Sequence, residues 1–112
     1  MTVYVKNLVP AKIAEASQTT QYTANGVTTI IDKFTATNYS AAAATISVNL
    51  VTTGGAAGNL NLITKTKTLQ PSEVYTFPEL VGQVLNAGDF ISTLAGTASS
   101  INIRVSGREV TI

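Results

Sequence analysis

The stretch that decides the fold is Val84-Leu85-Asn86-Ala87-Gly88-Asp89-Phe90-Ile91-Ser92-Thr93-Leu94, followed after a small-residue loop by Ile101-Asn102-Ile103-Arg104-Val105-Ser106-Gly107-Arg108-Glu109-Val110. The second limb alternates, with Ile101, Ile103 and Val105 on one face and Asn102, Arg104 and Ser106 on the other. This period of two is typical of a strand with one buried and one solvated face. The first limb turns at residues 86–89, where Asn, Gly and Asp tolerate the dihedral angles of a tight turn. We therefore expect a β-hairpin that closes a β-sandwich.

Strand signals continue through the rest of the chain. Further short strands are expected over residues 3–8, 18–23, 28–37, 45–51, 60–69 and 74–77. Turn signals separate them at intervals of roughly 8 to 12 residues, the pattern of an all-β sandwich. The sequence thus predicts a single β-sandwich of about seven to nine short antiparallel strands. The pattern does not choose between a jelly-roll and an immunoglobulin-like strand order.

The clearest isolated strand is the one over residues 45–51. Its alternation predicts that Ile46, Val48 and Leu50 face the core, whereas Ser47 and Asn49 face solvent. The next strand carries two lysines, Lys65 and Lys67, on one face. Lysines in this position are typical of a solvated edge strand that must not pair with another molecule.

Four local features mark turns and irregularities. Asn25-Gly26 is a strong two-residue hairpin signal, and Pro71 suits the second position of a turn over residues 70–73. Pro10 is expected to end or bend the opening strand. Asp32 falls on the apolar face of the strand over residues 28–37, so we expect either an edge position or a β-bulge there.

Composition bounds the class of protein. The chain has 112 residues, of which 45% are hydrophobic and 12% charged, and its net charge is +1. This length suits one domain, here residues 1–112, with residues 1–18 expected as an N-terminal arm. Nucleic-acid binders carry clustered Lys and Arg, which this chain lacks, so we expect no nucleic-acid partner.

The chain shows no signal for a membrane or for secretion. No run of about 18 apolar residues is present, so no transmembrane helix is expected. The segment Met1-Thr2-Val3-Tyr4-Val5-Lys6 lacks the basic start and apolar core of a signal peptide. There is no cysteine, so no disulfide is expected.

The residues for most enzyme chemistry are missing. Without histidine or cysteine, the chain has no Ser-His-Asp or Cys-His catalytic set and no common zinc site. Glu73 and Glu79 lie beside prolines and are interpreted as exposed turn acids. Asp89 is interpreted as a turn residue that accepts hydrogen bonds from nearby backbone N–H groups. We therefore predict no catalytic residue, no metal and no cofactor.

Four residues are candidates for a protein interface. Arg104, Arg108 and Glu109 form the densest charged group, which suits either a solvated strand face with an ion pair or an interface anchor. Tyr39 lies in a polar loop, where it suits either packing at the core rim or contact with a partner. Both interpretations stay open for each of these residues.

Several of these segments also match a known pattern. They are residues 28–38, an Ala-rich turn, residues 45–51, the turn at 70–73, the strand at 74–77, Leu85-Asn86-Ala87-Gly88-Asp89-Phe90-Ile91, and the ending Ile103-Arg104-Val105-Ser106-Gly107-Arg108-Glu109. In order and spacing they resemble small β-sandwich virion proteins of tailed bacteriophages, over about residues 20 to 110. The first eighteen residues lie outside this match.

The resemblance implies a non-enzymatic structural protein located in the virion and made in the host cytoplasm. A capsid decoration or cement protein is the first expectation, and a neck, tail or fibre module is the alternative. The implied partners are the major capsid protein, other virion proteins and further copies of the chain, with the N-terminal arm reaching a neighbouring subunit. A carbohydrate-binding module is less favoured, because the chain has no Trp and only 6% aromatic residues.

Overall fold

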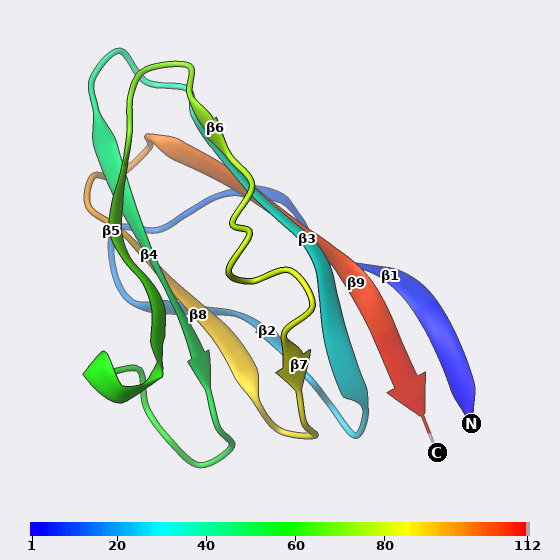
Figure 1. Ribbon diagram of the computed structural model, residues 1–112. Coiled ribbons are helices and arrows are strands. Elements are labelled where there is room, and N and C mark those ends of the chain that lie inside the picture. The colour runs from blue at the N-terminus through cyan, green and yellow to red at the C-terminus, as the bar shows by residue number, and fades with distance from the viewer. Residues whose placement is uncertain (112) are drawn as a thin grey trace.

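A computed structural model describes residues 1–111, which form nine strands in two antiparallel sheets packed face to face (Figure 1). The strands are β1 (Thr2–Ile13), β2 (Thr19–Thr23), β3 (Thr28–Asn38), β4 (Ala44–Val51), β5 (Leu62–Leu69), β6 (Val74–Tyr75), β7 (Val84–Leu85), β8 (Phe90–Ala95) and β9 (Ile101–Thr111). The one helical element in this part of the chain is the 3₁₀ turn η1 (Asn59–Asn61), and no helix there is long enough to span a membrane. The predicted all-β sandwich is confirmed.

The strand order identifies the topology. Sheet A runs β1-β9-β3-β6, with β7 also paired to β3, and sheet B runs β2-β8-β4-β5. Strands therefore pair as β1 with β9, β2 with β8, β3 with β6 and β7, and β4 with β5. The chain is one long antiparallel ribbon, doubled back at the β4–β5 connection and rolled so that its strands alternate between two sheets. This is a jelly roll, which decides between the two topologies that the sequence left open.

The hairpin expected over residues 84–110 is not formed. β8 lies in sheet B between β2 and β4, whereas β9 lies in sheet A between β1 and β3, and residues 96–100 cross from one sheet to the other. The Asn25-Gly26 turn likewise joins β2 in sheet B to β3 in sheet A. Both predictions were wrong for one reason: a turn signal specifies that the chain reverses, but not whether the next strand pairs locally or crosses to the opposite sheet.

The core lies between the two sheets and follows the predicted alternation. Ile101, Ile103 and Val105 are fully buried, as expected. The rings of Phe34 and Phe77 lie against each other at the centre, with centroids 4.5 Å apart. Burying an apolar side chain of this size contributes roughly 1.5–3 kcal/mol, so these contacts provide much of the stability.

Two predicted irregularities are present. The pairing of β3 with β9 shifts register between Ile31 and Lys33, so the intervening Asp32 is a bulge residue that points to solvent. Pro10 bends β1 without ending it, because pairing with β9 shifts between Val9 and Lys12 and then continues. Of the two alternatives expected for Asp32, an edge position or a β-bulge, the structure shows the bulge.

Two polar residues of β4 are more buried than predicted. Ser47 and Asn49 are only 8% and 2% exposed, although they point away from the core. The loop after β4 folds back over this face, and the Asn49 amide donates to the carbonyl of Gly58 at 3.0 Å and to Oδ1 of Asn61 at 2.7 Å. Ser47 Oγ accepts from the N–H of Thr66 on β5 at 2.8 Å. The predicted exposure of both residues was wrong because alternation within β4 does not reveal contacts with residues of the following loop and strand.

The N-terminal segment forms part of sheet A. β1 pairs along its length with β9 and is the last strand of that sheet. The sequence pattern also predicts that residues 110–112 extend the final strand, but Ile112 lies outside the described part of the chain.

Candidate functional site

The four candidate interface residues do not gather in one place. Tyr39 is 52% exposed at one end of the sandwich, where its N–H donates to the carbonyl of Ser100 at 3.0 Å. Arg108 lies seven residues beyond Ile101 on β9, roughly 23 Å along a strand that rises about 3.3 Å per residue. Tyr39 and Arg108 therefore lie far apart along the sheet and do not form one cluster.

The charged group at the end of β9 divides between two faces. The guanidinium of Arg108 makes a bidentate pair with Asp32 on the outer face, with Nη2 2.9 Å from Oδ1 and Nε 3.0 Å from Oδ2. The hydrogen bond to Asp32 raises the pKa of Arg108. Glu109 points to the other side of β9, where Lys6 Nζ lies 3.2 Å from its Oε1. Arg104 is exposed on the outer face, and no ion pair within residues 1–111 includes it.

Glu109 belongs to a polar contact between the two sheets. The hydroxyl of Tyr22, on β2 of sheet B, donates to Glu109 on β9 of sheet A. The same hydroxyl lies 2.7 Å from Thr29 Oγ1 on β3. Burial, followed by the hydrogen bond to Glu109, raises the pKa of Tyr22 to about 12. We call this contact of Tyr22, Thr29 and Glu109 the first clasp.

A second clasp joins the sheets at the opposite side of the sandwich. Glu79 accepts hydrogen bonds from Thr64 on β5 and from the hydroxyl of Tyr75 on β6, the latter at 2.7 Å. Burial alone would raise the pKa of Glu79, but these two hydrogen bonds, a backbone hydrogen bond and the charge of Lys67 together lower it. The bond to Glu79 raises the pKa of Tyr75 to about 12. Glu79 is therefore half-buried and fixed, in contrast to the exposed turn acid predicted from the sequence.

The remaining carboxylates also accept internal hydrogen bonds. Asp89 accepts from the N–H groups of Asn86 and Thr53, both at 3.0 Å, which confirms its predicted role as a turn residue. Glu73 closes its own turn by accepting from the N–H of Gln70 at 2.7 Å.

Glu15 completes the set of six acids in the chain. It accepts hydrogen bonds from Gln21 and Lys12, both at 2.9 Å. The bond from Gln21, followed by that from Lys12, lowers the pKa of Glu15. Every carboxylate side chain of the chain is thus committed to an internal contact, and no group of three metal-ligating side chains occurs within residues 1–111.

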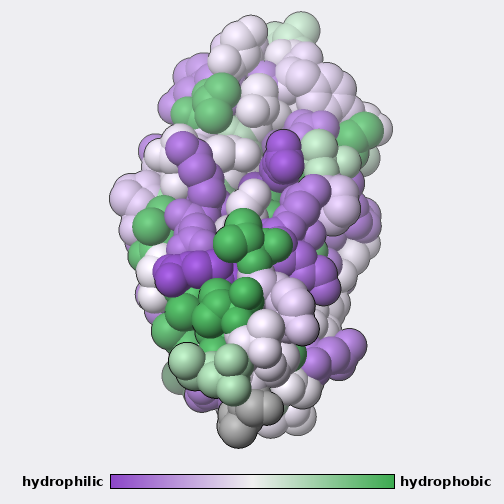
Figure 2. All heavy atoms as spheres, turned by 90° about the vertical axis from the view of Figure 1, so that its right-hand side faces the viewer, coloured by the Kyte–Doolittle hydropathy of each residue, from purple (hydrophilic) through white to green (hydrophobic). Residues whose placement is uncertain are grey.

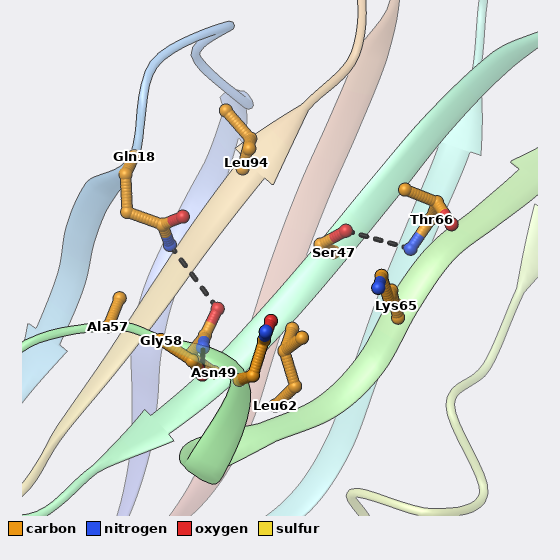
Figure 3. Close-up of a pocket in the computed structure, with 10 residues that line it drawn as sticks. Gln18, Ser47, Asn49, Ala57, Gly58, Leu62, Lys65, Thr66 and Leu94 are labelled. Carbon is orange, nitrogen blue, oxygen red and sulfur yellow. Dashed lines mark hydrogen bonds between the residues drawn. The ribbon is translucent and has the colours of Figure 1, made fainter.

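The outer face of sheet B carries a cavity of about 230 Å³ under the folded-back loop (Figure 3). Its lining is Gln18, Ser47, Asn49, Ala57, Gly58, Asn59, Leu62, Lys65, Thr66 and Leu94. Polar lining groups bond one another (Figure 3): the Gln18 amide donates to Asn49 Oδ1 at 3.4 Å, and the N–H of Thr66 donates to Ser47 Oγ at 2.8 Å. None of the lining residues is aromatic, so the cavity lacks the stacking surface that a sugar ring usually needs.

The outer face of sheet A has a different character. One row across four strands reads Val5, Arg108, Ile30 and Val84, because these residues are paired directly. The next row pairs Val3 with Val110. Figure 2 shows this face, where hydrophobic side chains gather in patches between hydrophilic ones. Val3 is 50% exposed and Val5 88% exposed, so apolar surface at the β1 edge is left open to solvent.

The sequence reasoning missed this β1 surface. The alternation Val3-Tyr4-Val5-Lys6 was seen, but it only predicts a strand. Whether that strand lies inside a sheet or at its edge depends on the pairing of β1 with β9, which is separated from it by most of the chain. One sequence signal could have indicated the exposed apolar surface: residues 2–5 carry no charged side chain on either face of the strand.

The motifs behind the resemblance have structural roles in this chain. Gly88 has a φ of +92°, which an L side chain rarely adopts, and it is the third residue of the turn that begins at Asn86 and ends at Asp89. At Gly107 a Cβ would collide with the carbonyl oxygen of Ile30 and lie 2.8 Å from Leu8 Cδ1. No protein-family model, curated protein or solved structure gives a significant match to this chain.

Proposed function

We propose that this chain is a non-enzymatic structural protein of a tailed-phage virion, a capsid decoration or cement protein that bridges subunits of the major capsid protein. The observation that carries the proposal is a contrast within the molecule. The six side-chain carboxylates are held by internal hydrogen bonds, whereas valines at the edge of sheet A are open to solvent. Such a surface suits binding to protein better than it suits acid–base chemistry.

The resemblance and the topology support the same proposal. Jelly rolls occur in viral capsid proteins and also in lectins, which is a fold-level analogy only. The aromatic-free cavity on sheet B gives a lectin-like role no specific support. We therefore favour the virion role over a lectin-like role.

The mechanism is burial of apolar and neutral-polar surface between capsid subunits. Hydroxyls, amides and valines cost less to remove from water than charges do. A stable contact of this kind buries roughly 1,200–2,000 Å² in total. Many copies on one shell make individually modest contacts strong in sum.

Co-sedimentation with DNA-free heads of tailed phages that lack a decoration protein tests the proposal. Hundreds of bound copies per head are expected for a decoration protein. Tens of copies or fewer, located at the neck or tail, would replace this proposal with the neck, tail or fibre role. Absence of binding to every particle tested would overturn both roles.

The variant Arg104→Ala probes the outer face of sheet A in the same assay. Because Arg104 is exposed and forms no ion pair in residues 1–111, its loss should leave the fold intact and weaken binding to heads. Lys65→Ala is the matched control, since it removes an exposed cation from the other sheet.

A further inference from the structure

We propose that β1 pairs through its free edge with β1 of a second copy, so that the two copies of sheet A join into one continuous antiparallel sheet. This inference concerns the chain itself and does not depend on the virion role. It rests on the backbone, the side chains and the symmetry of residues 2–7.

The backbone of residues 2–7 is suited to pairing. β1 is the last strand of sheet A, and from Thr2 to Asn7 it pairs with β9 without a register shift. Its other side therefore presents backbone N–H and C=O groups in the regular spacing of a strand edge. Beyond Asn7 the strand is bulged at Leu8 and interrupted by Pro10, which has no N–H, so the competent segment ends there.

The side chains of this segment leave the edge unprotected. Exposed edges are normally blocked by charges, prolines or bulges. Here Val3, Tyr4 and Val5 are 50%, 55% and 88% exposed, and the one charge, Lys6, is paired with Glu109. Large, exposed apolar side chains on an unblocked edge indicate a strand that is covered in the working molecule.

Symmetry favours a second copy as the occupant. A two-fold axis perpendicular to the sheet leaves the outer faces of both copies on the same side of the joined sheet. Residues directly opposite each other in an antiparallel pair point to the same face, so the axis must pass midway between two copies of one residue. With the axis at Tyr4, the two copies of Tyr4 face each other. Val3 then lies opposite Val5 of the second copy, and Thr2 lies opposite Lys6 of the second copy.

This register places like with like and separates equal charges. On the outer face, Val110, Val3 and Val5 of the second copy form one apolar row, and the two-fold axis generates a second. The two copies of Lys6 are offset by four residues, roughly 13 Å along the strand, which exceeds the screening length of about 8 Å at physiological salt. This register therefore aligns valines with valines and brings no like charges face to face.

Single-cysteine variants test the register directly, because the chain contains no cysteine of its own. Residues directly opposite each other have Cα atoms about 4.5–5.5 Å apart, within the range that a disulfide bridges. We expect Tyr4→Cys to give a covalent dimer under mild oxidation. Val5→Cys should not, because its two copies are offset by two residues. Leu60→Cys, at a fully exposed position near the opposite edge, measures random collisions.

A dimer yield at least tenfold higher for Tyr4→Cys than for both other variants would support the proposal. Equal yields at all three positions, or a yield highest at Val5→Cys, would overturn the register. Absence of crosslinking at every position would overturn the pairing itself, in favour of a monomer or of an extended segment from another protein on this edge. Because no phage head is present in this assay, its failure is separate from failure of the proposed virion role.

Discussion

The two long edge strands, β1 and β5, end opposite sheets and present opposite surfaces. β5 is bulged twice against β4 and carries Lys65 and Lys67. Thr66 between them has a φ of +44°, which breaks the strand geometry further. The first half of β1 has neither bulge nor Pro, and its exposed side chains include two valines and a tyrosine.

The difference indicates which edge strand is protected against pairing with a strand of another molecule. Bulges and lysines prevent another strand from adding to a sheet. β5 uses both devices, and the side chain of Lys67 also lies over the ring of Tyr75, 4.8 Å from its centroid. β1 places its irregularities only after Asn7. The contrast supports the proposal that residues 2–7 pair with a second copy, whereas the bulges and lysines of β5 keep that edge unpaired.

The largest effect should come from the core that both edges share. Ile103→Asp places an unpaired charge at a fully buried position of β9 and should unfold the domain, a loss of more than about 4 kcal/mol. Circular dichroism and thermal melting measure it. Arg104→Ala, on the exposed side of the same strand, should change stability by less than about 0.5 kcal/mol. A cooperative native melt for Ile103→Asp would contradict the inward assignment.

A smaller loss of stability should come from the close packing around Gly107 on β9. Gly107→Ala introduces a Cβ against the Ile30 carbonyl and Leu8, so we expect a loss of about 1–3 kcal/mol from overpacking. Gly58→Ala is the control, because its Cβ would meet no atom within 4 Å. Urea unfolding of both variants measures the difference. Equal stabilities would show that the strands around Gly107 are not packed tightly at this point.

The second clasp, formed by Glu79 with Thr64 and Tyr75, should make the stability of the protein depend on pH. The pKa of Glu79 is lowered below its ordinary value of 4.5, so its contribution is present above about pH 4.5 and is lost as the pH falls through the folded-state value. Glu79→Gln should therefore destabilise the protein by about 1 kcal/mol at pH 7 and by less at pH 3. Urea unfolding at the two pH values measures this change. A difference that is the same at both would exclude an ionised Glu79 as the cause.

The smallest effect should follow from weakening the closed edge. Lys65→Val removes one lysine from β5 but leaves its bulges, so stability should change by less than about 0.5 kcal/mol and association should not change. Light scattering at increasing concentration measures association. New aggregation in this variant would show that the lysine, and not the strand geometry, protects β5.

Local pattern was enough to predict the class of fold and several individual residues. Alternation assigned Ile101, Ile103 and Val105 to the core, and one charge on an apolar face revealed the bulge at Asp32. Alternation could not reveal that consecutive strands cross between sheets, because that depends on partners distant in sequence. For the same reason the candidate residues Arg108 and Glu109 were recognised without their partners, and the open edge of β1 was missed.

Sedimentation velocity of the purified protein tests the central claim most directly. The account predicts that the wild-type chain forms a dimer whose fraction rises with concentration. Val5→Lys, at a position 88% exposed and therefore tolerant in the monomer, should sediment as a folded monomer, whereas Leu60→Lys should behave as wild type. A wild-type chain that stays monomeric at all concentrations, or a Val5→Lys variant that still dimerises, would contradict it.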